Sequence, residues 1–158
     1  MPPVKLAVAA VVLLVQPHDD GREMYAEFFR HHELTVVCPD DVAEALTLAP
    51  TADVIVTELR LPGALDGYEF IQRLRADQQT RHKPVIVVTS WAWQTERLRA
   101  EEAGCDLFLT KPCLPQVLLN HIYKALTPAK LRRMRARHIK AEAHAHDSPQ
   151  RRRPKRRA

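Results

Sequence analysis

Short apolar runs alternate with helix-like segments along most of the chain. Five of these runs predict strands, at residues 6–15, 34–38, 54–56, 84–88 and 107–109. They are rich in β-branched residues and hold few polar ones, a pattern typical of strands that are buried on both faces. Since helices connect them, the pattern predicts a parallel sheet that is covered on both sides.

Between and after the strands, apolar residues recur at spacings of three and four, which predicts amphipathic helices. Gly104 is expected to end the fourth helix in the left-handed conformation, and Pro115 fits the first turn of the fifth. The helical segments are 22–31, 42–49, 66–74, 97–103 and 114–125.

Acidic residues precede three of these helical segments and predict their N-terminal caps. A carboxylate at such a position accepts hydrogen bonds from backbone amides that the helix leaves unpaired. The candidates are Asp19 or Asp20 for the first helix, Asp40 or Asp41 for the second and Asp66 for the third.

The carboxyl ends of parallel strands meet at one edge of a sheet, where ligands bind in folds of this class. Polar and turn-forming residues follow the predicted strands there. The segments that we expect to meet at this edge are 16–20, 58–63, 89–91 and 110–112.

Charge is distributed unevenly along the chain. Residues 129–158 hold 12 of the 24 Lys and Arg residues and 2 of the 19 Asp and Glu residues, a net charge of +10. The rest of the chain therefore has 12 basic and 17 acidic side chains, a net charge of −5. This contrast predicts a globular domain over residues 1–127 and a basic tail over 128–158, which is partly helical and then disordered.

The tail ends in two basic triplets, and three roles for them stay open. Such a block binds nucleic-acid phosphates without sequence specificity, folds back onto an acidic surface or stays solvated as an inert extension. No helix-turn-helix pattern is present, so sequence-specific DNA binding is not expected. The triplets are Arg151, Arg152 and Arg153, and Lys155, Arg156 and Arg157.

Three cysteines, Cys38, Cys105 and Cys113, lie outside any CxxC motif. Their number and spacing suggest neither a disulfide framework nor a zinc site, which favours a reducing, cytoplasmic location. The apolar run at 6–15 is too short to cross a bilayer, so no membrane association is expected. We interpret that run as a buried strand rather than as a signal peptide.

Four sequence motifs lie at the predicted strand ends and connections. Together and in this order, they resemble the receiver domain of bacterial response regulators, the CheY-like family, over residues 5–126. The resemblance implies a flavodoxin-like three-layer α/β sandwich with a five-stranded parallel sheet and five helices. The motifs are Val15 with Arg-Glu-Met at 22–24, Glu-Leu-Arg-Leu-Pro-Gly at 58–63 with Asp-Gly-Tyr-Glu at 66–69, Pro-Val-Ile-Val-Val-Thr-Ser at 84–90, and Ala-Gly-Cys-Asp at 103–106 with Leu-Thr-Lys-Pro at 109–112.

In this family, a histidine kinase passes a phosphoryl group to an aspartate at the end of the third strand. The resemblance implies that two acidic residues after the first strand hold Mg²⁺ together with that aspartate. In this chain, Gln16 and Pro17 stand at the positions of the acidic pair, and Glu58 stands at the position of the acceptor. The phosphoacceptor site is therefore expected to be degenerate.

Other positions keep the family pattern. Thr89 stands at the position of the hydroxyl that binds phosphoryl oxygens, Lys111 at that of the lysine and Phe108 at that of the switch aromatic. Trp91 and Trp93 follow in a loop where receivers commonly meet partners. We expect these two residues either to form an interaction surface or to pack over the fourth helix.

The substitutions change the expected chemistry. Mg²⁺ prefers octahedral oxygen coordination with one or two carboxylates, whereas Gln16 supplies a neutral oxygen and Pro17 supplies no side-chain ligand. Glu58 is one methylene longer than aspartate, which moves its oxygens by about 1.5 Å, and a misplacement of about 1 Å can slow a reaction ~100-fold. We therefore expect no cofactor, with Mg²⁺ binding weak or lost.

Two questions about the pocket stay open. Asp19 and Asp20 would join it if the register shifted, although helix capping explains Asp20 more simply. Glu58 either mimics the phosphorylated state by reaching Lys111, so that the switch residues are held in an active-like arrangement, or forms a structural ion pair at a vestigial site.

The predicted function is a stand-alone atypical receiver in two-component signalling that is not an enzyme. We expect it to act by protein contact and independently of ordinary aspartyl phosphorylation, through the face around Trp91, Phe108 and the last helix of the body. Its partner would be a histidine kinase or a downstream effector, and homodimerisation is a further expectation. The alternatives are nonspecific nucleic-acid binding through the tail and slow phosphorylation of Glu58.

Overall fold

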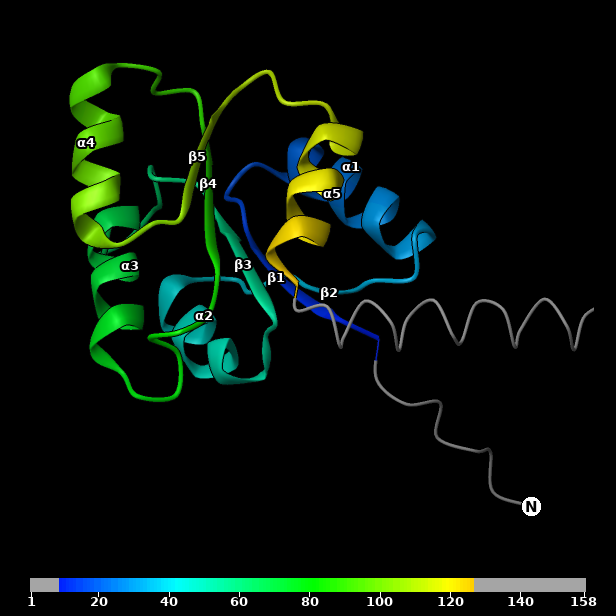
Figure 1. Cartoon of the computed structure of the whole chain (residues 1–158), viewed down its shortest axis with the longest axis horizontal. Helices are drawn as coiled ribbons and strands as arrows, with labels where there is room; N and C mark the ends of the chain where they lie inside the picture. The colour runs from blue at the N-terminus through cyan, green and yellow to red at the C-terminus, as the bar shows by residue number, and fades with distance from the viewer. Residues whose placement is uncertain (1–8, 127–158) are drawn as a thin grey trace, which may run out of the picture. The chain divides into compact units, whose positions relative to one another are not determined.

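Five parallel strands form one sheet in the computed structural model, which describes residues 9–126. The sheet order is β2-β1-β3-β4-β5, so β1 and β3 lie side by side in its middle (Figure 1). Each pair of neighbouring strands is parallel. The strands are β1 (Val11–Val15), β2 (Thr35–Val37), β3 (Val54–Thr57), β4 (Val85–Thr89) and β5 (Leu107–Thr110).

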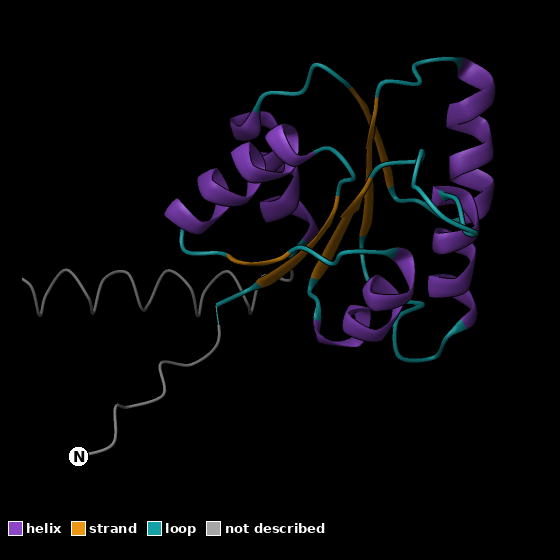
Figure 2. Cartoon of the chain, turned by 180° about the vertical axis from the view of Figure 1, so that it is seen from behind, coloured by secondary structure: helices purple, strands orange, loops and turns teal. Residues whose placement is uncertain are grey.

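Helices cover both faces of this sheet. One face is covered by α1 and α5 and the other by α2, α3 and α4 (Figure 1, Figure 2). The predicted flavodoxin-like three-layer sandwich is confirmed. The helices are α1 (Asp19–His31), α2 (Val42–Leu48) followed by a short 3₁₀ turn (Ala49–Thr51), α3 (Gly67–Ala76), α4 (Gln94–Ala103) and α5 (Pro115–Ala125).

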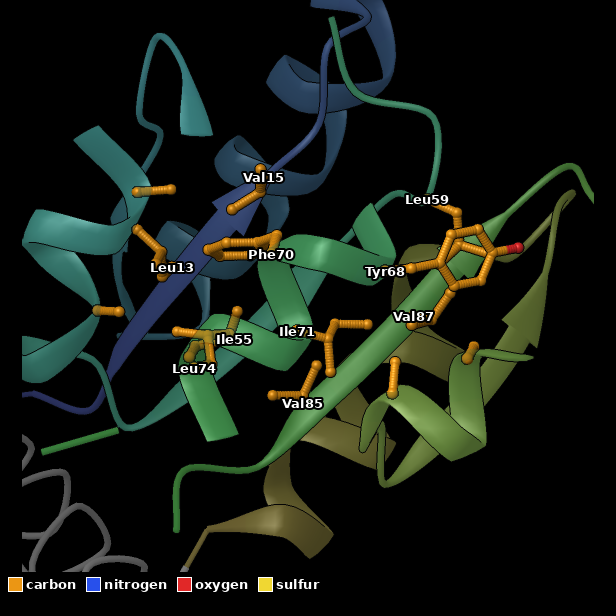
Figure 3. Packing of buried hydrophobic residues seen from close by; sticks show 14 of the residues in the cluster. Leu13, Val15, Ile55, Leu59, Tyr68, Phe70, Ile71, Leu74, Val85 and Val87 are labelled. Atoms are coloured by element: carbon orange, nitrogen blue, oxygen red, sulfur yellow. The ribbon is translucent and has the colours of Figure 1, made fainter. Parts of the chain in front are cut away.

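The apolar side chains of the central strands fill the space between the sheet and the helices. All residues of β3 and β4 are buried, which explains why their sequences lack polar alternation. Phe70, Ile71 and Leu74 of α3 pack onto one face of the sheet (Figure 3). Helix α4 contributes much less to this core, because its buried residues are Ala100 and Ala103.

Several predicted helix ends are confirmed. The side chain of Asp41 accepts a hydrogen bond from the first turn of α2, and that of Asp66 does the same for α3. Gly104 ends α4 with a φ of 115°, in the left-handed region that favours glycine. Pro115 is the first residue of α5.

The predicted cap of α1 was wrong. The helix begins at Asp19, and the residue before it, His18, makes no side-chain capping hydrogen bond. Asp19 and Asp20 lie in the first turn, where carboxylates interact favourably with the helix dipole. Asp19 also pairs with Arg22 one turn later.

Some sequence predictions concern residues outside the described part. The boundary at 127, the helical start of the tail and the basic triplets therefore stay predictions. None of the described helices is long and apolar enough to cross a membrane. Within the same residues, the three cysteines are free thiols.

Arg75 of α3 joins the two loops that precede β4 and β5. Its guanidinium donates to the carbonyl oxygens of Gly104 at 2.9 Å, Arg81 at 2.8 Å and Lys83 at 2.7 Å, and it pairs with Asp106 at 2.9 Å. Arginine presents several donors in a rigid fork, so one side chain can satisfy several acceptors.

We expect Arg75→Met to lower the free energy of unfolding by about 3 kcal/mol, because several loop carbonyls would lose their donor. Arg73→Met, at an exposed position of the same helix, is the control and should change it by less than about 0.5 kcal/mol. Urea denaturation measures both values. Equal effects of the two substitutions would contradict the structural role of Arg75.

Candidate functional site

The carboxyl ends of the strands bring four polar residues to one edge of the sheet. Gln16 follows β1, Glu58 follows β3, Thr89 ends β4 and Lys111 follows β5. Backbone hydrogen bonds continue the ladders into this site: the amide of Glu58 donates to Val15 at 3.0 Å, and that of Lys111 donates to Thr89 at 2.8 Å. The backbone of the sheet therefore fixes where these side chains start.

A buried ion pair lies at the centre of the site. Lys111 Nζ is 3.0 Å from Glu58 Oε2 and donates to Gln16 Oε1 at 3.1 Å. The side chain of Glu58 is 5% exposed and that of Lys111 is 23% exposed, so solvent screens the pair weakly. Glu58 Oε1 accepts a hydrogen bond from the amide of Leu59 at 2.8 Å. Both carboxylate oxygens of Glu58 are thus engaged.

The Lys111 ammonium also sets the orientation of the Gln16 amide. An ammonium group can only donate hydrogen bonds, so Gln16 must face it with its oxygen. The amide nitrogen of Gln16 is buried and has no hydrogen-bond partner among residues 9–126. Leaving such a donor unpaired costs about 1–3 kcal/mol. The hydrogen bond between the Gln16 oxygen and Lys111 must therefore offset that cost.

Thr89 and Phe108 differ in how they relate to this pair. The hydroxyl oxygen of Thr89 accepts a hydrogen bond from the amide of Trp91 at 3.1 Å, so it is engaged with the following loop. Phe108 is buried, with 7% of its surface exposed, and its ring centroid lies 6.0 Å from the Arg97 guanidinium. The aromatic side chain therefore points inward, while the hydroxyl makes a local contact.

The remaining pocket candidates supply no group of metal ligands. Pro17 has no donor atom in its side chain, and Asp19 and Asp20 are exposed on α1. Across residues 9–126, no group of three or more His, Cys, Asp and Glu side chains could hold a metal ion. The sequence left open whether Asp19 and Asp20 join the pocket. Both lie exposed in the first turn of α1, and no hydrogen bond or ion pair that the structure shows joins either of them to Glu58 or Lys111.

The two tryptophans occupy different environments. Trp91 is half-buried and packs against the core, and the Arg60 guanidinium lies 4.4 Å from its ring centroid. Trp93 directly precedes α4 and is 67% exposed. A large apolar surface is therefore available to a partner at Trp93, whereas Trp91 belongs mostly to the body.

Gly67 belongs to the Asp-Gly-Tyr-Glu motif at 66–69, but its packing at the site was not among the sequence predictions. A Cβ atom at Gly67 would lie 2.5 Å from Leu59 Cα and 2.6 Å from the carbonyl oxygen of Glu58. The amide of Gly67 donates to the carbonyl of Leu59 at 2.8 Å. The start of α3 is therefore pressed against the backbone that carries Glu58. An Asp-Gly pair signals a turn in the sequence, but this close approach arises only in the folded chain.

Comparison with known proteins agrees with the fold. The model of the response regulator receiver domain matches residues 12–123, well over half of the chain. This chain belongs to the response regulator receiver domain family. Receiver domains act in two-component signalling, where histidine kinases and effectors are their partners, so this coarser part of the predicted function is confirmed.

Similar receiver sequences occur in longer bacterial regulators. The response regulator PleD of Caulobacter vibrioides is 31% identical over 101 residues, 64% of this chain and 22% of PleD. The phosphate regulon regulator PhoB of Escherichia coli is 30% identical over 117 residues, 73% of this chain and 51% of PhoB. The likeness thus spans from about a fifth to half of these relatives.

Solved receiver structures resemble this one throughout the body. The chemotaxis protein CheY4 of Vibrio cholerae is 26% identical with a TM-score of 0.69, covering 75% of this chain and 100% of CheY4. The receiver domain of the sensor histidine kinase PA1611 of Pseudomonas aeruginosa is 27% identical with a TM-score of 0.68, covering 75% and 98%. That structure has a magnesium ion coordinated in its active-site cleft.

We expect Gly67→Ala to lower the free energy of unfolding by about 2 kcal/mol, because the added methyl group forces α3 away from the Glu58–Leu59 backbone. Gly21→Ala is the matched control, since nothing lies within 4 Å of a Cβ atom there. It should be neutral or stabilise by up to about 1 kcal/mol, as expected for alanine within a helix. Thermal unfolding that shows the same loss for both variants would contradict the crowding at Gly67.

We expect Lys111→Met to lower the free energy of unfolding by about 2–3 kcal/mol, because the charge of Glu58 would stay buried without its cation. Combining it with Glu58→Gln should restore most of the loss, since no unpaired charge remains. Lys124→Met, at an exposed position of α5, serves as the control. The pairing is contradicted if denaturation shows Lys111→Met to be as stable as the parent.

Proposed function

We propose that this receiver domain works by protein contact and without ordinary aspartyl phosphorylation. The observation behind the proposal is the Lys111 ammonium, which lies 3.0 Å from Glu58 and 3.1 Å from Gln16. It places a positive charge between the two side chains that would otherwise be closest to binding a cation. The predicted function is stand-alone in the sense that the proposed protein contact requires no attached output domain.

The donor set of the site does not fit Mg²⁺. This ion needs near-octahedral oxygen coordination and takes one or two carboxylates. Both oxygens of Glu58 and the oxygen of Gln16 already accept hydrogen bonds, and Pro17 adds no ligand. A divalent cation bound there would also be repelled by the nearby Lys111 ammonium. The PA1611 receiver coordinates magnesium in its cleft, and we propose that this chain does not.

Phosphoryl transfer is disfavoured for the same reasons. The reaction depends on positioning and on neutralising the charge of the transferred group. Without the metal, Lys111 would have to neutralise that charge while it is already paired with Glu58. The longer side chain of Glu58 adds a displacement of about one bond length, about 1.5 Å.

The ion pair supports a fixed state of the switch. Glu58 reaches Lys111 directly, and Phe108 is buried as expected of the inward position. The hydroxyl of Thr89 donates no hydrogen bond to Glu58 or Lys111 and accepts one from the Trp91 amide. The fixed state that we propose therefore involves Lys111 and Phe108 but not Thr89. We propose that the Glu58 carboxylate thereby acts as a constant negative charge at the acceptor position and mimics the phosphorylated state.

The surface proposed for the partner lies at α4 and the loop before it. Trp93 is 67% exposed and Leu98 is 49% exposed, while Trp91 and Phe108 support the surface from the body. Exposed tryptophans are enriched among residues that dominate binding energy at interfaces. The partner is a protein of two-component signalling, a histidine kinase or an effector. Homodimerisation and nucleic-acid binding by the tail remain predictions.

Intrinsic tryptophan fluorescence during titration with Mg²⁺ and then beryllofluoride tests this proposal, because the backbone amide of Trp91 donates a hydrogen bond to the Thr89 hydroxyl. We expect no saturable change in the native chain. The matched variant Gln16→Asp/Pro17→Asp/Glu58→Asp restores the family pattern and should respond to both ligands, which shows that the probe can detect a working site.

A saturable response of the native chain would contradict the proposal. Metal-dependent labelling by a small phosphodonor that is lost in Glu58→Gln would also contradict it, and would establish Glu58 as a slow phosphoacceptor.

A further inference from the structure

Helix α4 is attached to the body by little apolar surface. Its buried residues are Ala100 and Ala103, whereas the neighbouring α3 buries two aromatic and two branched aliphatic side chains. Hydrophobic stabilisation grows with the apolar area that is buried, so two alanines hold a helix weakly. The larger apolar side chain of Leu98 is 49% exposed. Contacts of another kind must therefore fix the position of α4.

Besides the Arg97 guanidinium of α4, which lies 6.0 Å from the ring centroid of Phe108 in β5, those contacts come from the beginning of α3 and centre on Tyr68. Its hydroxyl donates a hydrogen bond to Glu96 Oε2 of α4. The Arg99 guanidinium, also from α4, lies 4.0 Å from the Tyr68 ring centroid and 4.0 Å from Asp66 Oδ2. A hydrogen bond to a charged acceptor is stronger than a neutral one, whereas the contacts of the exposed Arg99 side chain contribute less. We call Tyr68, Glu96, Arg99 and Asp66 the Tyr68 clamp.

Tyr68 is well placed for this role because its ring is part of the core. It is 3% exposed and packs at the start of α3 among the side chains of the buried cluster (Figure 3). Burial, together with the hydrogen bond to Glu96, raises the pKa of the Tyr68 hydroxyl. The hydroxyl therefore stays protonated, as a donor, at neutral pH.

The Tyr68 clamp is connected to the site by adjoining backbone. Asp66 caps α3, and the next residue, Gly67, is pressed against the carbonyl oxygen of Glu58. Tyr68 follows directly. The backbone at Glu58 is therefore linked through adjoining residues to the residue that contacts α4, along a route that does not include the Thr89 hydroxyl.

We infer that Tyr68 is the positioning residue for α4 and that α4 is the element released when the Tyr68 clamp opens. The inference deepens the proposed function, because α4 carries Leu98 and directly follows Trp93 of the proposed contact surface. Opening the clamp changes how these two side chains are presented to a partner. The sheet and the other helices are expected to keep their positions, because α4 adds only Ala100 and Ala103 to the apolar cluster that holds them.

Hydrogen exchange of the full chain, followed by mass spectrometry, tests the inference. Tyr68→Phe keeps the ring and removes the hydroxyl, so amides of α4 should exchange roughly ten-fold faster or more, while those of α3 and the strands change less than about two-fold. Tyr25→Phe is the matched control. Tyr25 is equally buried at 3% exposure, and its hydroxyl donates to Cys113 on the α1 side of the sheet. The Tyr25→Phe substitution should leave the exchange rates of the α4 amides unchanged.

Glu96→Ala breaks the same bond from the α4 side and replaces Tyr68→Phe if that variant does not fold. Glu101→Ala, which removes another carboxylate of α4 paired with Arg97 on the surface, is its control. Both substitutions break the same hydrogen bond. The double variant Tyr68→Phe/Glu96→Ala should therefore accelerate hydrogen exchange in α4 no more than either single substitution does.

Faster exchange that is equal in α4 and in the sheet would overturn the inference, since Tyr68 would then merely stabilise the fold. Unchanged exchange of α4, or the same acceleration in Tyr25→Phe, would also overturn it. The measurement uses no partner, metal or phosphodonor. Its failure is therefore distinguishable from failure of the proposed function, which the fluorescence titrations test.

Discussion

The ion pair between Lys111 and Glu58 is the interaction on which the site depends. Both charges are largely removed from water, so each needs the other to offset the loss of hydration. Residues from β1, β3 and β5 meet there because parallel strands end at the same edge of the sheet. The orientation of Gln16, with its oxygen toward the ammonium, follows from the pair and not from its own hydrogen-bonding needs.

The same edge of the sheet connects the pair to the surface. Close packing of Gly67 on the backbone of Glu58 ties α3 to the site, and the polar contacts of Tyr68 tie α4 to α3. The two helices are held by different forces. Apolar burial fixes α3, whereas α4 relies on a hydrogen bond and on an arginine over an aromatic ring, contacts that a small displacement can break.

The chain has the receiver fold, and the altered donor set that we propose for it rests on a few residues at the strand ends. The fold depends on many buried apolar positions, and it tolerates Gln16, Pro17 and Glu58 because these replace polar side chains at a strand end. Metal coordination depends on a few ligand positions, and this is why we propose that the residues at those positions alter it here. Family membership therefore follows from the whole body, while the function proposed for this member follows from the residues at one edge of the sheet.

The sequence by itself determined the layers of this protein, since apolar periodicity, the caps at Asp41 and Asp66 and the glycine at Gly104 act over a few residues. It also indicated that Glu58 and Lys111 would lie close together. Only the tertiary structure decided that Asp19 faces solvent and that Tyr68 bonds to α4. These outcomes depend on how distant elements pack and on which of several acceptors each donor reaches, and local sequence patterns do not encode that choice.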